Sequence, residues 1–113
     1  MAIKNTADYT SFASLDMRVG KITNVEDSAT KKPTYRLTVD FGTEIGKKIS
    51  CGAYRNYSKE ELLGKQVVGV VNFVPKKMGP ELSEVLILGV QNPKGETIYL
   101  KPQIDVDLGV EVF

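Results

Sequence analysis

The sequence predicts an all-β domain, a small closed barrel of five strands with one short helix between the third and fourth strands. Apolar and polar residues alternate over 35–41, which is typical of a strand with one buried face. A nearly continuous β-branched run over 67–73 indicates a strand buried on both faces. Between these segments, Ser58 and Glu61 match the capping box of a helix start, and Gly64 is typical of a helix end.

A short segment with helical spacing precedes the first strand. Apolar residues spaced three apart after Asp8, a residue able to cap, predict a short N-terminal helix. From Leu15 the spacing changes to every second residue, which predicts the first strand. The apolar parity then shifts between Gly20 and Ile22. A β-bulge or sharp bend beside Gly20 would produce this shift, and small closed barrels need such bends.

The segments after the second strand complete the barrel. A turn at 42–44 and an extended segment at 45–51 form a hairpin with the second strand. After the short helix and the fourth strand, a loop between two prolines over 75–80 leads into a fifth apolar strand over 83–90. Five strands with a helix between the third and fourth are the arrangement of the OB-fold, a Greek-key barrel used for nucleic acids.

A further strand pair is expected after the barrel. A short extended piece at 97–101 is followed by alternation of apolar and polar residues over 104–112. We therefore predict a single domain over 1–113, with the barrel at about 14–91 and a C-terminal strand extension at about 97–113. An apolar strip beyond a small core needs another partner, so we expect the extension to pack against a further surface.

The composition excludes several kinds of site. The chain has 113 residues, 42% hydrophobic and 26% charged, with no His and a single cysteine, Cys51. This excludes His-activated nucleophiles, His metal sites, an intramolecular disulfide and multi-cysteine metal sites. Asp105 and Asp107 would share one strand face, and a solvated face suits them better than acid-base work. We expect no cofactor, no metal and no enzyme activity, and a buried structural thiol at Cys51.

The sequence favours a cytoplasmic location. Its first twelve residues lack the apolar core of a signal peptide, and no apolar run approaches the roughly 20 residues of a membrane helix. One cysteine fits a reducing compartment. No membrane insertion is expected.

Charge is unevenly distributed along the chain, although the net charge is only +1. Residues 1–30 hold three basic and four acidic groups, residues 31–77 hold ten and four, and residues 78–113 hold two and six. The three segments therefore carry −1, +6 and −4. Local fields rather than net charge steer partners, so the basic block indicates an anionic ligand.

Three separated motifs lie on the predicted strands and on the loop after the fourth strand. They are LDMRVGKI at 15–22, VDFG at 39–42, and NFVPKKMG at 72–79 followed by Ser83 and Glu84. In this order they resemble the tRNA-binding domain family, over nearly the whole chain. That family includes the C-terminal domain of many methionyl-tRNA synthetases and small stand-alone dimeric tRNA-binding proteins.

Within that family, the runs at 40–46 and 83–89 look most like the CsaA branch of secretion-related cytosolic chaperones. The synthetase-type domains usually carry a Ser-x-Gly-Met pattern where this chain has Ser83 followed by Glu84. The resemblance implies an OB-fold and a homodimer to which the C-terminal extension contributes. It also implies two kinds of ligand, namely tRNA and unfolded or precursor proteins.

Candidate ligand-binding residues combine basic charge, aromatic rings and polar groups at strand ends. Clustered cations attract a phosphate backbone, and aromatic residues beside cations suit stacking on unpaired bases. A flexible methionine suits an adaptable apolar pocket. The residues expected to bind tRNA or peptide are Arg18, Lys47, Lys48, Ser50, Tyr54, Arg55, Asn72, Phe73, Lys76, Lys77, Met78, Ser83 and Glu84.

Each assignment has a structural alternative that the sequence leaves open. Any single lysine can be ordinary solvated surface, and one of the two tyrosines Tyr54 and Tyr57 is expected in the core. Asn72 and Ser83 can instead end their strands with local turn hydrogen bonds. Met78 can fill the core.

Two functions follow, and neither is enzymatic. In the first, a CsaA-like chaperone holds unfolded segments in apolar pockets near Phe73, Met78 and Val85, edged by Lys76 and Lys77. In the alternative, a stand-alone tRNA-binding protein acts through shape and phosphate contacts.

Overall fold

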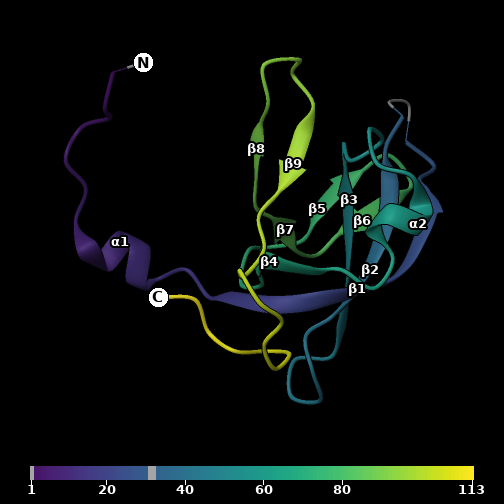
Figure 1. Ribbon diagram of the computed structural model, residues 1–113. Coiled ribbons are helices and arrows are strands. Elements are labelled where there is room, and N and C mark those ends of the chain that lie inside the picture. Colours follow the sequence, from purple (N-terminus) through teal and green to yellow (C-terminus); the bar gives the residue numbers. More distant parts are fainter. Residues whose placement is uncertain (1, 31–32) are drawn as a thin grey trace.

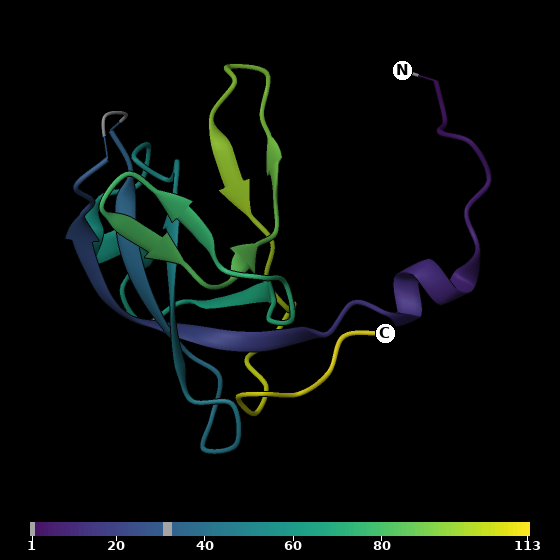
Figure 2. The same ribbon diagram turned by 180° about the vertical axis from the view of Figure 1, so that it is seen from behind.

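The computed structural model describes residues 2–30 and 33–113. A small β-barrel forms the body of the molecule, and the N-terminal segment projects from it as an arm, as Figure 1 and Figure 2 show. The described elements, in chain order, are α1 (Tyr9–Ala13), β1 (Met17–Asp27), β2 (Tyr35–Asp40), β3 (Lys47–Gly52), α2 (Lys59–Leu62), β4 (Gln66–Val70), β5 (Lys76–Met78), β6 (Glu81–Ser83), β7 (Leu86–Ile87), β8 (Gly89–Gln91) and β9 (Thr97–Tyr99).

The barrel is built on one five-stranded antiparallel sheet in the order β3-β2-β1-β4-β7. Its two edge strands approach each other where the backbone N–H of Glu84 donates to the carbonyl of Ile49 in β3, at 2.7 Å. This bond lies just before β7 and nearly closes the sheet. The predicted all-β, five-stranded barrel with a short helix between its third and fourth strands is therefore confirmed.

The core follows the alternation seen in the second strand. Leu37 and Val39 in β2, and Phe41 directly after it, are at most 1% exposed. Fully buried Ile22, Leu62 and Val67 from other elements pack in the same cluster. Burying such a side chain contributes roughly 1.5 to 3 kcal/mol, so this interior carries most of the stability that the barrel has.

The long strand β1 contains the predicted bulge, but at a different residue. The register between β1 and β2 shifts between Ile22 and Asn24, which makes Thr23 the extra residue. A bulge beside Gly20 is not found, because the pairing with β4 is regular there. The predicted shift of parity is present, since Gly20 and the residue before it are both buried and Ile22 is buried after them. Gly20 is required for space: a Cβ on it would lie 2.6 Å from Cγ1 of Val39.

Both predicted helices are present. Asp8 occupies the N-cap position of α1, but its side chain makes no capping hydrogen bond. In α2 the capping box is complete, since the Ser58 hydroxyl accepts from the Glu61 N–H and the Glu61 carboxylate accepts from the Ser58 N–H. Within residues 2–30 and 33–113, no helix has the length and apolar character needed to cross a membrane.

The segment around 75–80 differs from its prediction as a loop. Lys76–Met78 and Glu81–Ser83 pair as the antiparallel ribbon β5–β6, joined by a two-residue turn at Gly79 and Pro80. Gly79 has φ +61°, which suits the first central position of such a turn.

The predicted strand over 83–90 is also broken into pieces. The amides of Glu84 and Val85 both donate to Ile49 in β3, β7 then pairs with β4, and β8 pairs with β9. The chain therefore takes three different partners in succession over this segment. Sequence alternation does not reveal which partner a strand takes.

The C-terminal segment over 104–112 is irregular apart from one bridge between Glu111 and Arg18. It lies along the first half of β1, where the Val19 N–H donates to the Val110 carbonyl at 3.1 Å. β2 pairs with β1 only from Lys21 onward, so this segment occupies the edge that β2 leaves open. The predicted continuous strand is wrong here, because the segment makes three backbone bonds to β1 and turns at Gly109, whose φ is +86°.

Both terminal segments lie near the start of β1. Figure 1 and Figure 2 show the C-terminal end beside α1 in both views. Their apolar side chains remain uncovered: Ile3 is 98% exposed, and Tyr9, Ile104 and Phe113 are exposed too.

Candidate functional site

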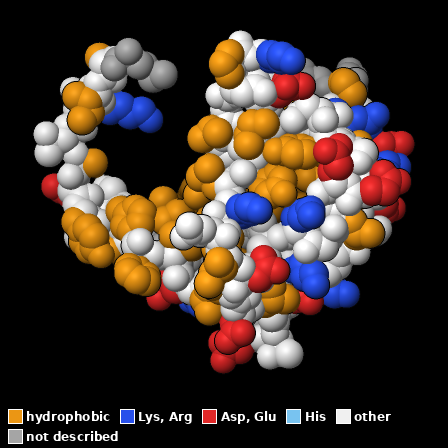
Figure 3. Space-filling model, viewed as in Figure 1, with side chains coloured by type: hydrophobic (Ala, Val, Ile, Leu, Met, Phe, Trp, Pro, Cys, Tyr) orange, Lys and Arg blue, Asp and Glu red, His pale blue; other side chains and the backbone are white. Residues whose placement is uncertain are grey.

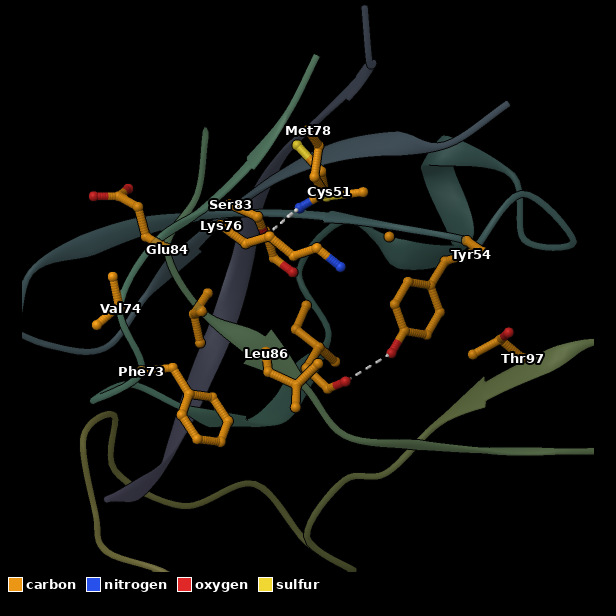
Figure 4. A pocket seen from close by; sticks show the side chains of 15 residues that line it. Cys51, Tyr54, Phe73, Val74, Lys76, Met78, Ser83, Glu84, Leu86 and Thr97 are labelled. Atoms are coloured by element: carbon orange, nitrogen blue, oxygen red, sulfur yellow. Dashed lines mark hydrogen bonds between the residues drawn. The ribbon is translucent and has the colours of Figure 1, made fainter. Parts of the chain in front are cut away.

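A hollow of about 730 Å³ opens on the barrel where β3, the β5–β6 ribbon and β7 meet. Figure 3 shows apolar side chains gathered over this face beside the β8–β9 hairpin, with Lys and Arg side chains next to them. Figure 4 shows the hollow from close by. Its lining residues are Ser50, Cys51, Gly52, Ala53, Tyr54, Phe73, Val74, Lys76, Met78, Ser83, Glu84, Val85, Leu86, Ile87 and Thr97.

The β5–β6 ribbon decides which of its side chains reach the hollow. Lys76 is the cross-strand partner of Ser83, and Lys77 is the partner of Leu82. Directly opposed residues of an antiparallel pair project on the same face, and successive residues alternate between faces. Lys76, Ser83 and Met78 accordingly line the hollow, whereas Lys77 and Leu82 do not.

Two of the predicted ligand residues also complete the barrel. The Ser83 hydroxyl accepts a hydrogen bond from the Cys51 N–H at 3.1 Å, and the Glu84 carboxylate accepts one from the Ile49 N–H at 2.9 Å. Both donors lie on the edge of β3 that faces away from β2. Side chains therefore satisfy backbone groups that a neighbouring strand would otherwise take up.

Tyr54 forms a buried wall of the hollow. It is 5% exposed, and its hydroxyl donates to the Ile87 carbonyl at 3.2 Å. Burial raises the pKa of Tyr54 to about 12, because the phenolate would lose its hydration. The Tyr54 ring is part of the core cluster. This matches the expectation that one of the two tyrosines, Tyr54 or Tyr57, lies in the core.

The cysteine thiol lies on the same wall. Cys51 is buried, as expected, and burial raises the pKa of its thiol. The neutral thiol is therefore the stable form at neutral pH. This fits the expected structural role.

The predicted cations fall into two groups. Arg55 pairs with Asp27 at 2.8 Å and lies over the Tyr35 ring, and Arg18 pairs with Asp16 and donates to the Gly109 carbonyl. These two arginines stabilise the barrel and its tail. Among the described residues, no ion pair occupies the other four predicted cations, which are Lys47, Lys48, Lys76 and Lys77.

Asn72 lies outside the hollow. Its side-chain carbonyl accepts from the Asp16 N–H and its amide donates to the Ser14 carbonyl, both at 2.8 Å. It thus fixes the link between α1 and β1. The sequence left open a local turn hydrogen bond for Asn72, but the partners found lie 56 and 58 residues away in the chain.

The structure brings together seven of the thirteen predicted ligand residues and leaves six elsewhere. The missed lining residues include Val74 and Leu86, whose apolar side chains are strongly exposed. Leu86 falls in the predicted apolar strand over 83–90, so its exposure was not predictable, and Val74 lies between the predicted strand over 67–73 and the loop over 75–80. The seven in the hollow are Ser50, Tyr54, Phe73, Lys76, Met78, Ser83 and Glu84. The six outside it are Arg18, Lys47, Lys48, Arg55, Asn72 and Lys77.

Comparison with known proteins adds a family to this geometry. A family model described as "Putative tRNA binding domain" matches residues 17–111. The structure is similar to that of the chaperone CsaA from Bacillus anthracis, with 36% identity, 96% of this chain and 100% of that chain covered, and a TM-score of 0.90. For the CsaA chaperone protein from Picrophilus torridus, identity is 38%, the TM-score is 0.91 and the coverage is the same.

Curated relatives are much longer proteins. A methionine–tRNA ligase from Nanoarchaeum equitans is 38% identical over 92% of this chain, and one from Pyrococcus horikoshii is 37% identical over 92%. The chain spans only 13% and 14% of these two relatives. The similarity is therefore to one part of a ligase.

Proposed function

Because this chain belongs to the tRNA-binding domain family, we propose that it is a binding protein of the CsaA type, a cytoplasmic chaperone for unfolded or precursor polypeptides that takes part in protein secretion. The observation that carries this proposal is the apolar hollow. Phe73, Val74 and Leu86 present large apolar surfaces to solvent there, beside the polar rim of the β5–β6 ribbon. Concave apolar sites with a few polar groups are typical ligand sites.

The energetics suit an unfolded polypeptide. Each apolar side chain that the hollow buries contributes roughly 1.5 to 3 kcal/mol, against the cost of ordering the segment that carries it. A few such side chains give reversible binding. Flexible Met78 allows the lining to adapt to side chains of different shape, as a chaperone with many clients requires.

Suppression of client aggregation tests the proposal. Leu86 lines the hollow and Leu82 does not, yet both leucines are 51% exposed. Leu86→Ser and Leu82→Ser therefore remove the same apolar surface from two places. We expect Leu86→Ser to weaken suppression of light scattering by an unfolded precursor at least threefold, and Leu82→Ser to leave it unchanged.

The outcome that contradicts a chaperone site at the hollow is equal suppression by the two serine variants. Circular dichroism and thermal unfolding show whether each variant keeps the fold. Suppression should persist at high salt, because burial of apolar surface does not depend on attraction between charges.

A second candidate function is tRNA binding, which the family membership and the four lysines without ion pairs favour. Lysines that neutralise phosphates release counterions, so affinity falls steeply with salt. We expect the double variant Lys47→Glu, Lys48→Glu to lower affinity for bulk tRNA and to reduce the salt slope by about two. Leu86→Ser should leave tRNA binding intact. Binding of tRNA that ignores both salt and these lysines would contradict this second function.

We also propose a symmetric homodimer built from the terminal segments. Apolar side chains on the arm, such as Ile3 and Tyr9, and on the tail, such as Ile104 and Phe113, lie uncovered on nearby segments. A second copy of the chain would bury both sets, as a two-fold interface does. Sedimentation at micromolar concentration should give a dimer, and a monomer with an ordered tail would contradict it.

A further inference from the structure

The hollow contains a cation that no acidic side chain neutralises. Lys76 lines it, and among the described residues no carboxylate lies within ion-pair distance of its ammonium group. Figure 4 shows the Lys76 side chain extending across the hollow toward Tyr54. Glu84, the other charged lining residue, points away from Lys76 in this view and accepts the Ile49 N–H.

Two hydroxyl groups line the same hollow as this cation. Ser83 is the cross-strand partner of Lys76, and its hydroxyl accepts from the Cys51 N–H while keeping its own proton to donate. Ser50 precedes Cys51 and is only 4% exposed. No described residue hydrogen-bonds to the Ser50 hydroxyl. Every polar side-chain atom that is fully shielded from solvent in the described residues has a hydrogen-bond partner. The Ser50 hydroxyl is therefore not fully shielded, and it reaches the open hollow that Ser50 lines.

An ammonium group and two hydroxyl donors match an anionic acceptor, and the apolar surface beside them suits a carboxylate on a polypeptide better than a phosphate. A carboxylate can accept all three hydrogen bonds, and its charge-assisted bonds are stronger than neutral ones. A ligand ammonium group in the same place would be repelled by the Lys76 ammonium group, and no opposite charge would compensate for this repulsion. Charge complementarity therefore decides which residues can adjoin, in the ligand's sequence, the apolar side chain that binds in the hollow.

We propose that the hollow contains a carboxylate subsite formed by Lys76, Ser50 and Ser83. It selects polypeptide segments in which Asp or Glu directly neighbours a bulky apolar residue. The inference rests on the proposed polypeptide-binding function and specifies the substrate class of that site. The apolar side chain enters against Phe73 and Leu86, and the carboxylate reaches the Lys76 ammonium.

Fluorescence anisotropy with three short peptides tests the subsite. All are amidated at the C-terminus, share one Leu-Phe pair and differ in the next residue, which is Glu, Ala or Lys. We expect the Glu peptide to bind about tenfold more tightly than the Lys peptide at low salt, with the Ala peptide between them. Lys76→Glu should reverse this order.

Lys77→Glu is the matched control, because it makes the same charge change on the opposite face of β5. The Glu-to-Lys preference should stay within about twofold of the wild-type value in this control. Ser50→Ala should weaken only the Glu peptide. Both lysines are exposed, so the two charge reversals leave the buried core intact.

The results separate this inference from the proposed function. Equal binding of the three peptides, or an equal change in the two charge-reversal variants, overturns the carboxylate subsite and leaves polypeptide binding standing. Failure of every peptide to bind overturns the proposed function as well. An Ala peptide with a free C-terminal carboxylate that binds more tightly than the Glu peptide would instead make the site a reader of chain ends. If Lys76→Glu lost only its binding of an RNA oligonucleotide, Lys76 would be a phosphate contact. Either of these last two results overturns the inference.

Discussion

Tyr54 is the residue at which the barrel core and the hollow meet. Its ring packs in the core cluster while one face of the side chain lines the hollow, and its hydroxyl ends on the Ile87 carbonyl of β7. A ligand in the hollow would therefore contact a wall held from within by a buried hydrogen bond. Such a wall is rigid before the ligand arrives, which lowers the entropy that binding costs.

The pH dependence of stability tests this placement of Tyr54. Its pKa is raised to about 12 in the folded protein, whereas an unfolded tyrosine ionises near pH 10. The folded state holds the proton more tightly, so this contribution to stability is complete below about pH 10 and is lost as pH rises to about 12. Between pH 9 and 11.5, wild type should lose about 2 kcal/mol more free energy of unfolding than Tyr54→Phe.

Urea unfolding at several pH values provides this measurement. Tyr9→Phe is the control, because Tyr9 is exposed on the arm and its hydroxyl makes no hydrogen bond to any residue of 2–30 or 33–113. Its pH profile should match that of wild type. If Tyr54→Phe keeps the wild-type profile, the hydroxyl is not buried as described.

Two residues show which contacts could not be predicted from the sequence. The sequence offered local turn hydrogen bonds for Asn72 and Ser83, but both side chains bond to distant segments of the chain. Asn72 bonds to the link before β1, and Ser83 bonds to β3. The chain separations are 58 and 32 residues, and only the fold brings such positions together.

At the scale of the element, the C-terminal tail depends on one glycine. Gly109 has φ +86°, and a Cβ on it would lie 2.5 Å from the Phe41 carbonyl oxygen. Gly95 has a similar φ of +78°, with nothing within 4 Å of its Cβ position. The two residues therefore share the backbone strain of substitution, but only Gly109 has the steric conflict.

Replacing each glycine by alanine isolates the contact between tail and barrel. Gly95→Ala should cost about 1 kcal/mol from backbone strain alone, and Gly109→Ala about 1 to 3 kcal/mol more. Urea unfolding measures the difference. Amide exchange at Val19 and Val112, which bond across the tail contact, should speed up only in Gly109→Ala. Equal effects of the two changes would contradict the docked tail.

Elements with strong local signals were predicted well, and those that depend on a partner were not. The alternation in β2 and the capping box of α2 are local, and both are found as predicted. The two strands of the ribbon β5–β6 are joined by a turn at Gly79 and Pro80, and these residue types are equally typical of a loop. Alternation over 104–112 is equally regular, yet β2 and β4 leave only a short edge of β1 for it.

For the molecule as a whole, the net charge of +1 conceals pairing between segments that are far apart in sequence. Three cations of the basic block are taken up by acidic groups of other segments: Arg36 by Glu26 and Glu81, and both Arg55 and Lys59 by Asp27. Segment charge alone therefore overstates the field available to an RNA. Among the described residues, Lys76 has no ion pair and lies beside the apolar lining of the hollow, and this combination suits the proposed polypeptide ligand.

We expect extended apolar polypeptide segments to bind in the hollow between β3, the β5–β6 ribbon and β7. Titration of ¹⁵N-labelled protein with an apolar peptide, followed by two-dimensional NMR, tests it directly. We predict that the largest amide shift changes cluster at hollow-lining positions such as Gly52, Val74 and Leu86, while Leu82 on the opposite face of the ribbon stays unchanged. Saturable changes that centre on Leu82 or the arm, or no change at the hollow, would contradict it.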